Sequence, residues 1–209
     1  MSDSSLNARA LNKALTSKKI DEDSIIQISV SNNREKRQAI AENYQQLFNK
    51  PLLEDLKANT GGNFRETLLG LYTPLIDYDC QQLRKSVKGL GTDEKSLIEI
   101  LVTRSVDDLE KIRNRYPEIF PGRDLVYAVE DDTSGHFKDL LVSLINAQRS
   151  KNNNPDFSAC KNDATALAYA FEHKNEAKEQ KKITEIFTLR SKKEIELIIR
   201  NDSSVSGKD

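Results

Sequence analysis

The residues best suited to binding chemistry lie in one short stretch, Val87–Glu94, which reads VKGLGTDE. Glycines let a tight loop turn its carbonyls inward without obstruction by side chains. The carbonyls of alternate residues, Val87, Gly89 and Gly91, could then face one centre. Calcium takes about six to eight oxygen ligands, usually including a carboxylate, and a second stretch, 130–135 (EDDTSG), supplies carboxylates. The two stretches together predict a calcium site with open positions that a lipid phosphate could fill.

The same loop also has a purely structural interpretation. Gly89 could end one helix in a left-handed conformation, and Thr92 could cap the next helix. Asp93 and Glu94 would then favour the positive end of that helix dipole. Both interpretations require a helix on each side of the loop, so the surrounding elements must be considered next.

Helical periodicity extends over nearly the whole chain. Ser191–Glu194 has the pattern of a capping box, and Ser105 with Asp108 has a weaker version of it. Apolar residues recur with the spacing of amphipathic helices, whereas strand-like alternation is scarce. We count about five short helices in each 70 residues. The sequence therefore predicts an all-α protein.

An internal repeat organises these helices. A shift of 72 residues aligns the first third of the chain with the second, and one inserted residue extends the match to Leu144. The matched pairs include Leu11 and Leu83, Asp21 and Asp93, Ser24 and Ser96, Ile26 and Ile98, Ile40 and Ile112, Tyr44 and Tyr116, and Gly62 and Gly135. A fainter third copy, in which Leu167 matches Leu83, stops near Arg200.

The repeat divides the chain into six segments. They are an N-terminal polar segment (1–7), repeat 1 (8–76), repeat 2 (77–149), a linker (150–161), a partial repeat 3 (162–200) and a polar tail (201–209).

These motifs resemble those of the annexins, with KGLGTDE between the first two helices of a five-helix repeat and DTSGHF between the last two. Repeat 1 shows the same resemblance in LLEDLK and GGNF, and the likeness covers about residues 8–200. The resemblance implies an all-α, annexin-like array of repeats. It also implies calcium-dependent, peripheral binding to membranes rich in acidic phospholipid.

The resemblance also implies which residues act. The primary calcium ligands would be the carbonyls of Val87, Gly89 and Gly91 and the carboxylate of Asp132. A secondary ion would use the carbonyl of Thr92 and the side chain of Glu94. Lys88 lies where it could meet a lipid headgroup, although a solvated surface lysine is an equal alternative.

The other two copies depart from this pattern. In repeat 1 the matching loop, 15–22 (LTSKKIDE), has no glycine, and Asn59 stands where the carboxylate should be. In the third copy the loop, 173–179 (HKNEAKE), has no glycine and is two residues longer. We therefore expect one primary calcium site. Annexins pack a first repeat against a fourth, which this chain lacks, so we also expect exposed apolar faces and self-association.

Composition excludes several other classes of protein. The chain has 209 residues, with 32 basic against 33 acidic residues, which argues against a nucleic-acid-binding protein. No apolar run could span a membrane, and the N-terminus has no signal peptide, so we expect a cytoplasmic protein. His136 and His173 lie far in sequence from Cys80 and Cys160, which we expect to be small, partly buried hydrophobes. We expect no enzymatic activity; the alternative function is a calcium-independent helical scaffold that binds a cytoskeletal or membrane-associated protein.

Overall fold

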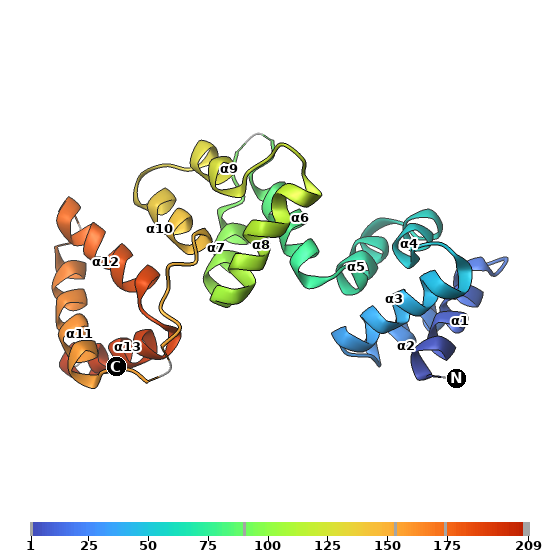
Figure 1. The fold of residues 1–209 in the computed structure, drawn as a ribbon, viewed down its shortest axis with the longest axis horizontal. Coiled ribbons are helices and arrows are strands. Elements are labelled where there is room, and N and C mark those ends of the chain that lie inside the picture. The colour runs from blue at the N-terminus through green and yellow to red at the C-terminus, as the bar shows by residue number, and fades with distance from the viewer. Residues whose placement is uncertain (1, 90, 153, 174, 207–209) are drawn as a thin grey trace. The chain divides into compact units, whose positions relative to one another are not determined.

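The fold is all-α, as predicted. The computed structural model describes residues 2–89, 91–152, 154–173 and 175–206, and within them it contains thirteen helices and no strand (Figure 1). No helix in this part of the chain combines the length and the hydropathy needed to cross a bilayer. The helices are α1 (Asp3–Thr16), α2 (Glu22–Val30), α3 (Arg34–Phe48), α4 (Leu52–Asn59), α5 (Gly62–Tyr72), α6 (Leu75–Ser86), α7 (Glu94–Thr103), α8 (Val106–Ile119), α9 (Leu125–Asp132), α10 (Gly135–Ile145), α11 (Phe157–Glu172), α12 (Ala177–Leu189) and α13 (Lys192–Ser206).

The helices follow the predicted repeat of five, with α1–α5 in the first copy, α6–α10 in the second and α11–α13 in the third. The chain forms two compact units, 1–78 and 79–209. In the first unit, α1 packs against α2 and α3, and α5 packs against α3 and α4. In the second unit, α11 packs against α12 and α13, and α10 packs against α7, α9 and α12.

Matched positions of the repeats have matched burial. Leu11 and Leu83 are fully buried, and so are Tyr44 and Tyr116. Both cysteines are thiols with no disulfide between them, and both are almost fully buried, whereas we expected partial burial. Ile26 and Ile98 also match, but each is 44% exposed. These two isoleucines therefore repeat on the outer side of the second helix and not in the core.

The structure confirms the predicted capping at Ser191 and at Ser105, whereas α2 and α7 are capped by aspartates for which the sequence patterns predicted no capping role. Asp21 accepts a hydrogen bond from the Ser24 N–H at 3.1 Å, and its repeat counterpart Asp93 accepts one from the Ser96 N–H at 3.2 Å. In the predicted capping box, the Ser191 N–H donates to the Glu194 carboxylate at 2.7 Å, and the Glu194 N–H donates to the Ser191 hydroxyl at 3.2 Å.

Several predicted boundaries differ from the structure. Most of the expected polar segment 1–7 is helical, because Ser2 caps α1 and Asp3 lies in its first turn. The linker expected to end at residue 161 ends earlier, because Asp156 accepts bonds from the N–H groups of Ser158 and Ala159 and so starts α11 at Phe157. In the expected polar tail, α13 continues to Ser206, and residues 207–209 lie outside the described part of the chain.

The loop expected over 173–179 is shorter than its sequence suggested. Helix α11 runs on to Glu172, and α12 already begins at Ala177, so Glu179 is a buried residue of the first helical turn. The two extra residues of this copy lengthen the helices instead of the loop. Lys174 lies outside the described residues.

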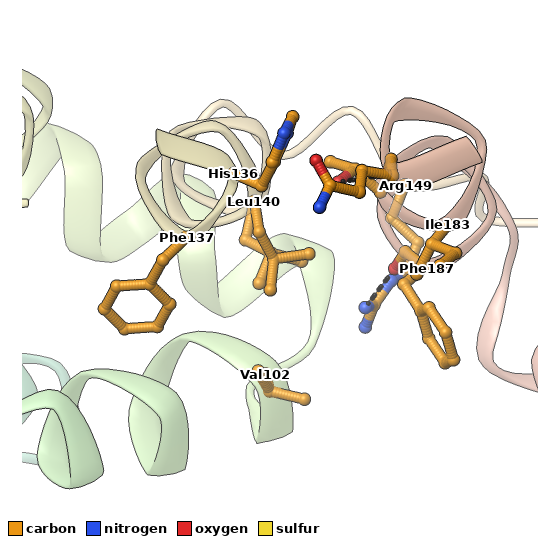
Figure 2. A pocket seen from close by; sticks show the side chains of 10 residues that line it. Val102, His136, Phe137, Leu140, Arg149, Ile183 and Phe187 are labelled. Carbon is orange, nitrogen blue, oxygen red and sulfur yellow. Dashed lines mark hydrogen bonds between the residues drawn. The ribbon is translucent and has the colours of Figure 1, made fainter. Parts of the chain in front are cut away.

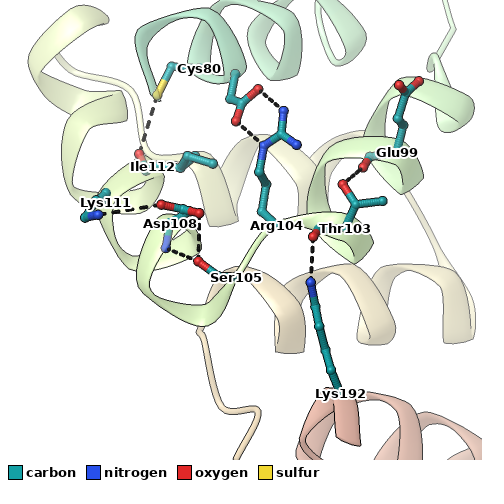
Figure 3. Close-up of polar contacts among 10 residues, drawn as sticks. Cys80, Glu99, Thr103, Arg104, Ser105, Asp108, Lys111, Ile112 and Lys192 are labelled. Carbon is teal, nitrogen blue, oxygen red and sulfur yellow. Dashed lines mark hydrogen bonds and ion pairs between the residues drawn. The ribbon is translucent and has the colours of Figure 1, made fainter. Parts of the chain in front are cut away.

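A buried ion pair ties α6 to the end of α7 in the second unit. The carboxylate of Asp79, which is fully buried, accepts two bonds from Arg104, at 2.5 Å from Nε and 2.9 Å from Nη2 (Figure 3). Its counterpart in the third copy is a pair between Asp163 and Arg190 at 2.5 Å. These two ion pairs fix the first two helices of the second and third copies, and with them the loop that joins those helices.

Candidate metal centre

The loop between α6 and α7 is closed by one backbone bond. The Asp93 N–H donates to the Ser86 carbonyl at 2.9 Å, so the two ends of the loop are held together. Gly89 has a φ of +130° and Gly91 a φ of +89°, a region that residues with a Cβ rarely adopt. A Cβ at either glycine would meet no atom within 4 Å. The glycines are therefore required by the backbone conformation and not by lack of space.

Among the described residues, no backbone donor in a loop or helix cap is bonded to the predicted carbonyl ligands, those of Val87, Gly89 and Gly91. Gly89 and Gly91 are exposed, and Val87 is half-buried. Carbonyl oxygens of this kind suit a hard cation such as calcium.

Asp132, the predicted carboxylate ligand, lies beside this loop although it is forty residues away in sequence. The Thr92 hydroxyl lies 2.6 Å from Oδ2 of Asp132 and 2.8 Å from its backbone carbonyl, as a donor to both. Asp132 is the last residue of α9 and forms no ion pair with a basic side chain of the described residues. Its carboxylate is therefore held at the loop by a neutral hydroxyl.

The role expected for Thr92 as the cap of α7 is wrong. Asp93 is the N-cap, and its bonds from the Ser96 hydroxyl and then from the Ser96 N–H lower the pKa of the Asp93 carboxyl. Because Asp93 takes the capping position, Thr92 is free to turn toward Asp132. Glu94 lies in the first turn of α7, and Lys88 lies within the loop; both are exposed.

Sequence reasoning missed the bond between Thr92 and Asp132. A signal for it exists, because both residues change together in repeat 1, to Ile20 and Asn59. Ile20 has no hydroxyl to donate. The Asn59 amide instead donates to the Asp55 carbonyl of its own helix at 2.9 Å.

The rest of the repeat 1 loop also differs from its counterpart. Ser17 matches Gly89, and its hydroxyl donates to the carbonyl of Lys19, the match of Gly91, at 2.5 Å. Ser17 has a φ of −65°. A carbonyl in the position of a calcium ligand is thus already occupied by a side chain of the loop itself.

The donor set of repeat 2 fits calcium better than a transition metal. Among the residues described, no group of three or more His, Cys, Asp or Glu side chains gathers as a metal site. The arrangement at the loop consists of carbonyl oxygens and one carboxylate, which are the ligands of a hard cation. Water or a ligand would have to complete such a coordination shell.

Comparison with known proteins agrees with this architecture. The Annexin family model matches residues 7–71 and 78–144. The chain belongs to the annexin family. It is 40% identical to annexin A4 of Mus musculus over 79% of this chain and 52% of that protein.

Solved annexin structures share the fold. A structure of annexin III has a TM-score of 0.88 and 33% identity, covering 100% of this chain and 64% of its own. A structure of calcium-bound annexin (Sm)1 has a TM-score of 0.84 and 25% identity, covering 99% of this chain and 62% of its own. This annexin chain thus spans about half to two thirds of the length of the relatives it matches.

Proposed function

We propose that this annexin binds acidic phospholipid membranes peripherally through one primary calcium site in repeat 2. The carbonyls of Val87, Gly89 and Gly91 and the carboxylate of Asp132 would hold the ion. When bound, calcium supplies open coordination positions for the phosphate oxygens of lipid headgroups. The protein itself contributes binding and orientation, with no catalytic step.

The contact of Thr92 with Asp132 carries this proposal. It supports a site because it joins the glycine loop to the only acidic residue that the resemblance assigns as a primary ligand. The loop carbonyls, to which no backbone donor in a loop or cap of the described residues is bonded, support it further. We propose the Thr92 carbonyl and the Glu94 side chain as ligands of a secondary ion. We propose Lys88 as a contact for a lipid headgroup. The side chains of Glu94 and Lys88 are both exposed at this loop.

One site implies modest affinity. Open calcium sites bind with dissociation constants of about 10⁻⁴–10⁻³ M, and membrane proteins gain avidity when several sites engage one surface. With a single intact loop, half-maximal membrane binding should require calcium near the millimolar range. A submicromolar calcium midpoint for a monomeric sample would contradict the single-site proposal.

Co-sedimentation with phosphatidylserine vesicles tests the site. We expect the protein to pellet with calcium and to remain in solution with chelator. Asp132→Ala should abolish the calcium-dependent pelleting, whereas Asp131→Ala, which removes an exposed neighbouring carboxylate, should leave it unchanged. Because both variants remove one negative charge at the end of α9, Asp131→Ala controls for the effect of that charge alone.

Two outcomes would refute the proposal. Failure to pellet at millimolar calcium would mean that the loop does not function as a membrane site. If the native protein and Asp132→Ala pellet to the same extent, and neither needs calcium to do so, the result would favour the calcium-independent scaffold.

A further inference from the structure

A second site of a different kind lies within residues 79–209, between α7, α10 and α12. It is a cavity of about 360 Å³. Apolar side chains form most of its wall, including Val102, Phe137, Leu140 and Ile183 (Figure 2). Ligand sites in proteins have volumes of about 300–1,000 Å³ and combine an apolar wall with a few polar groups. The cavity is thus large enough for a small ligand with an apolar part.

Four polar residues line the wall, His136, Arg149, Gln180 and Thr184, and of these Arg149 is a buried cation without a counter-ion among the described residues. Its side chain is buried, with 8% of the residue exposed. Nη2 donates to the Phe187 carbonyl at 2.8 Å, but the buried Nε has no hydrogen-bond partner, and no carboxylate of the described residues pairs with the guanidinium. Burial lowers the pKa of Arg149. A buried cation without an anion is costly, so this arrangement favours an anionic ligand.

The backbone holds Arg149 in this position from both sides. Just before it, Ala147 adopts a left-handed conformation with a φ of +54° and turns the chain away from α10. Just after it, the Ser150 N–H donates to the Leu189 carbonyl at the end of α12, at 2.8 Å. These two backbone features fix the chain on both sides of Arg149, and the bond from Nη2 to the Phe187 carbonyl holds the guanidinium at the cavity.

We propose that this cavity binds a single-chain amphipathic anion, with a carboxylate or phosphate at Arg149 and an alkyl tail against Phe137, Leu140 and Ile183. The anion would supply the charge that Arg149 lacks and accept the hydrogen bond of Nε. The tail would cover the apolar wall that is now open. This site shares no residue with the loop that contains Gly89 and Gly91.

This inference can be tested by isothermal titration calorimetry, in which decanoate, decyl phosphate or decanol is titrated into the full chain. Each compound is kept below its critical micelle concentration. The two anions distinguish a carboxylate from a phosphate ligand. We expect at least one anion to bind at least tenfold more tightly than decanol. Each methylene added to that anion, from octyl to decyl, should tighten binding about fourfold, as expected for burial of a CH₂ group.

Variants distinguish the contribution of the Arg149 charge to binding from the contribution of the apolar cavity. Arg149→Met should remove the preference for the anion, Arg149→Lys should keep part of it, and Arg9→Met, which changes an exposed arginine of α1, should have no effect. Leu140→Trp, which fills the cavity while Arg149 remains, should weaken the binding of every ligand. Melting temperatures check that each variant is folded.

The outcomes also separate this site from the calcium site. Asp132→Ala should bind decanoate or decyl phosphate as the native protein does, even if it no longer pellets with vesicles. Equal binding of decanol and of both anions by the native protein, or no saturable binding of any of them, would overturn the inference. Anion binding that survives both Arg149→Met and Leu140→Trp would also overturn it.

Discussion

Removal of the buried carboxylate of Asp79 should destabilise the second unit strongly. Asp79 accepts two bonds from Arg104, whose side chain is 28% exposed. Breaking a buried pair by removing one partner costs about 3–5 kcal/mol, because the remaining charge is left without compensation. Water reaches part of the Arg104 side chain, so we expect a value at the lower end, about 3 kcal/mol, for Asp79→Ala.

The third copy provides a matched control. Asp163 pairs with Arg190 at the equivalent position, but the Arg190 side chain is 40% exposed, and Asp163 receives a second, weak contact from Lys182 at 4.0 Å. Solvent screens this pair better. Asp163 is itself buried, but the Arg190 end of the pair is more open to solvent than Arg104, so Asp163→Ala should cost less than Asp79→Ala, about 1 kcal/mol.

Hydrogen exchange with mass spectrometry measures both effects, because it follows peptides of α6–α8 and of α11–α13 separately. A loss of about 3 kcal/mol corresponds to a fall in protection of about 100-fold in α6–α8 of Asp79→Ala. Asp163→Ala should lower protection in α11–α13 by less than tenfold. Equal losses in the two variants, or a loss below tenfold for Asp79→Ala, would refute the argument from burial.

Four further outcomes follow from the structure. Ala128→Asp should stabilise the protein by about 1 kcal/mol and so raise its melting temperature. It offers a carboxylate, like the one Tyr44 has in repeat 1, to the buried Tyr116 hydroxyl, for which the described residues supply no partner of normal hydrogen-bond geometry. Burial raises the pKa of both tyrosines, so their contribution to stability is complete below the unfolded value of about 10 and is lost as the pH rises further. The tyrosinate absorbance of Tyr44 and Tyr116, measured as the difference from the double variant Tyr44→Phe with Tyr116→Phe, should therefore appear together with alkaline unfolding. Gly91→Ala should raise the calcium midpoint of vesicle binding without changing the helical circular dichroism, since a side chain at its φ of +89° costs about 1–2 kcal/mol. Val30→Glu, which places a charge at a side chain 67% exposed, should lower any self-association seen in sedimentation velocity.

Local chemistry made much of the fold predictable. The capping box at Ser191 and the repeat of Tyr116 are patterns of neighbouring residues or of fixed spacing, so they can be recognised directly in the sequence. The order of five helices in a repeat follows from these patterns, and the resemblance to annexins adds how the helices pack. The calcium ligands at Gly91 and Asp132 were likewise assigned from a motif through the resemblance, and this assignment stays a prediction.

Long-range packing was not predictable in the same way. Thr92 looked like a helix cap because its type and position fit one, but Asp93 fits that position too, and only the packing of α9 beside the loop decides between them. The cavity at Arg149 depends on three helices from two different copies of the repeat, joined by a stretch with no periodicity. Nothing in the residues around Arg149 indicates that its side chain is buried.

A comparison of the two complete repeats gives the physical reason why we propose a cation site in the loop of repeat 2 and not in that of repeat 1. Both loops close with the same backbone bond, from Asp93 to Ser86 and from Asp21 to Ala14, so the helices impose the same frame on each. In repeat 1 the Ser17 hydroxyl occupies a loop carbonyl, and the guanidinium of Arg65 donates to the carbonyl that follows Asn59, with Nε at 2.6 Å.

Repeat 1 therefore satisfies its oxygens with its own donors and places a positive charge next to the position of the missing carboxylate. A cation there would have to displace a hydroxyl and approach a guanidinium, with no negative side chain in return. In repeat 2, no backbone donor in a loop or cap of the described residues is bonded to the carbonyls of Val87, Gly89 and Gly91, and the Asp132 carboxylate is held by the neutral Thr92 hydroxyl. The difference between the loops thus lies in which groups satisfy the oxygens, and restoring the two glycines of repeat 1 without changing Asn59 and Arg65 should not create a second calcium site.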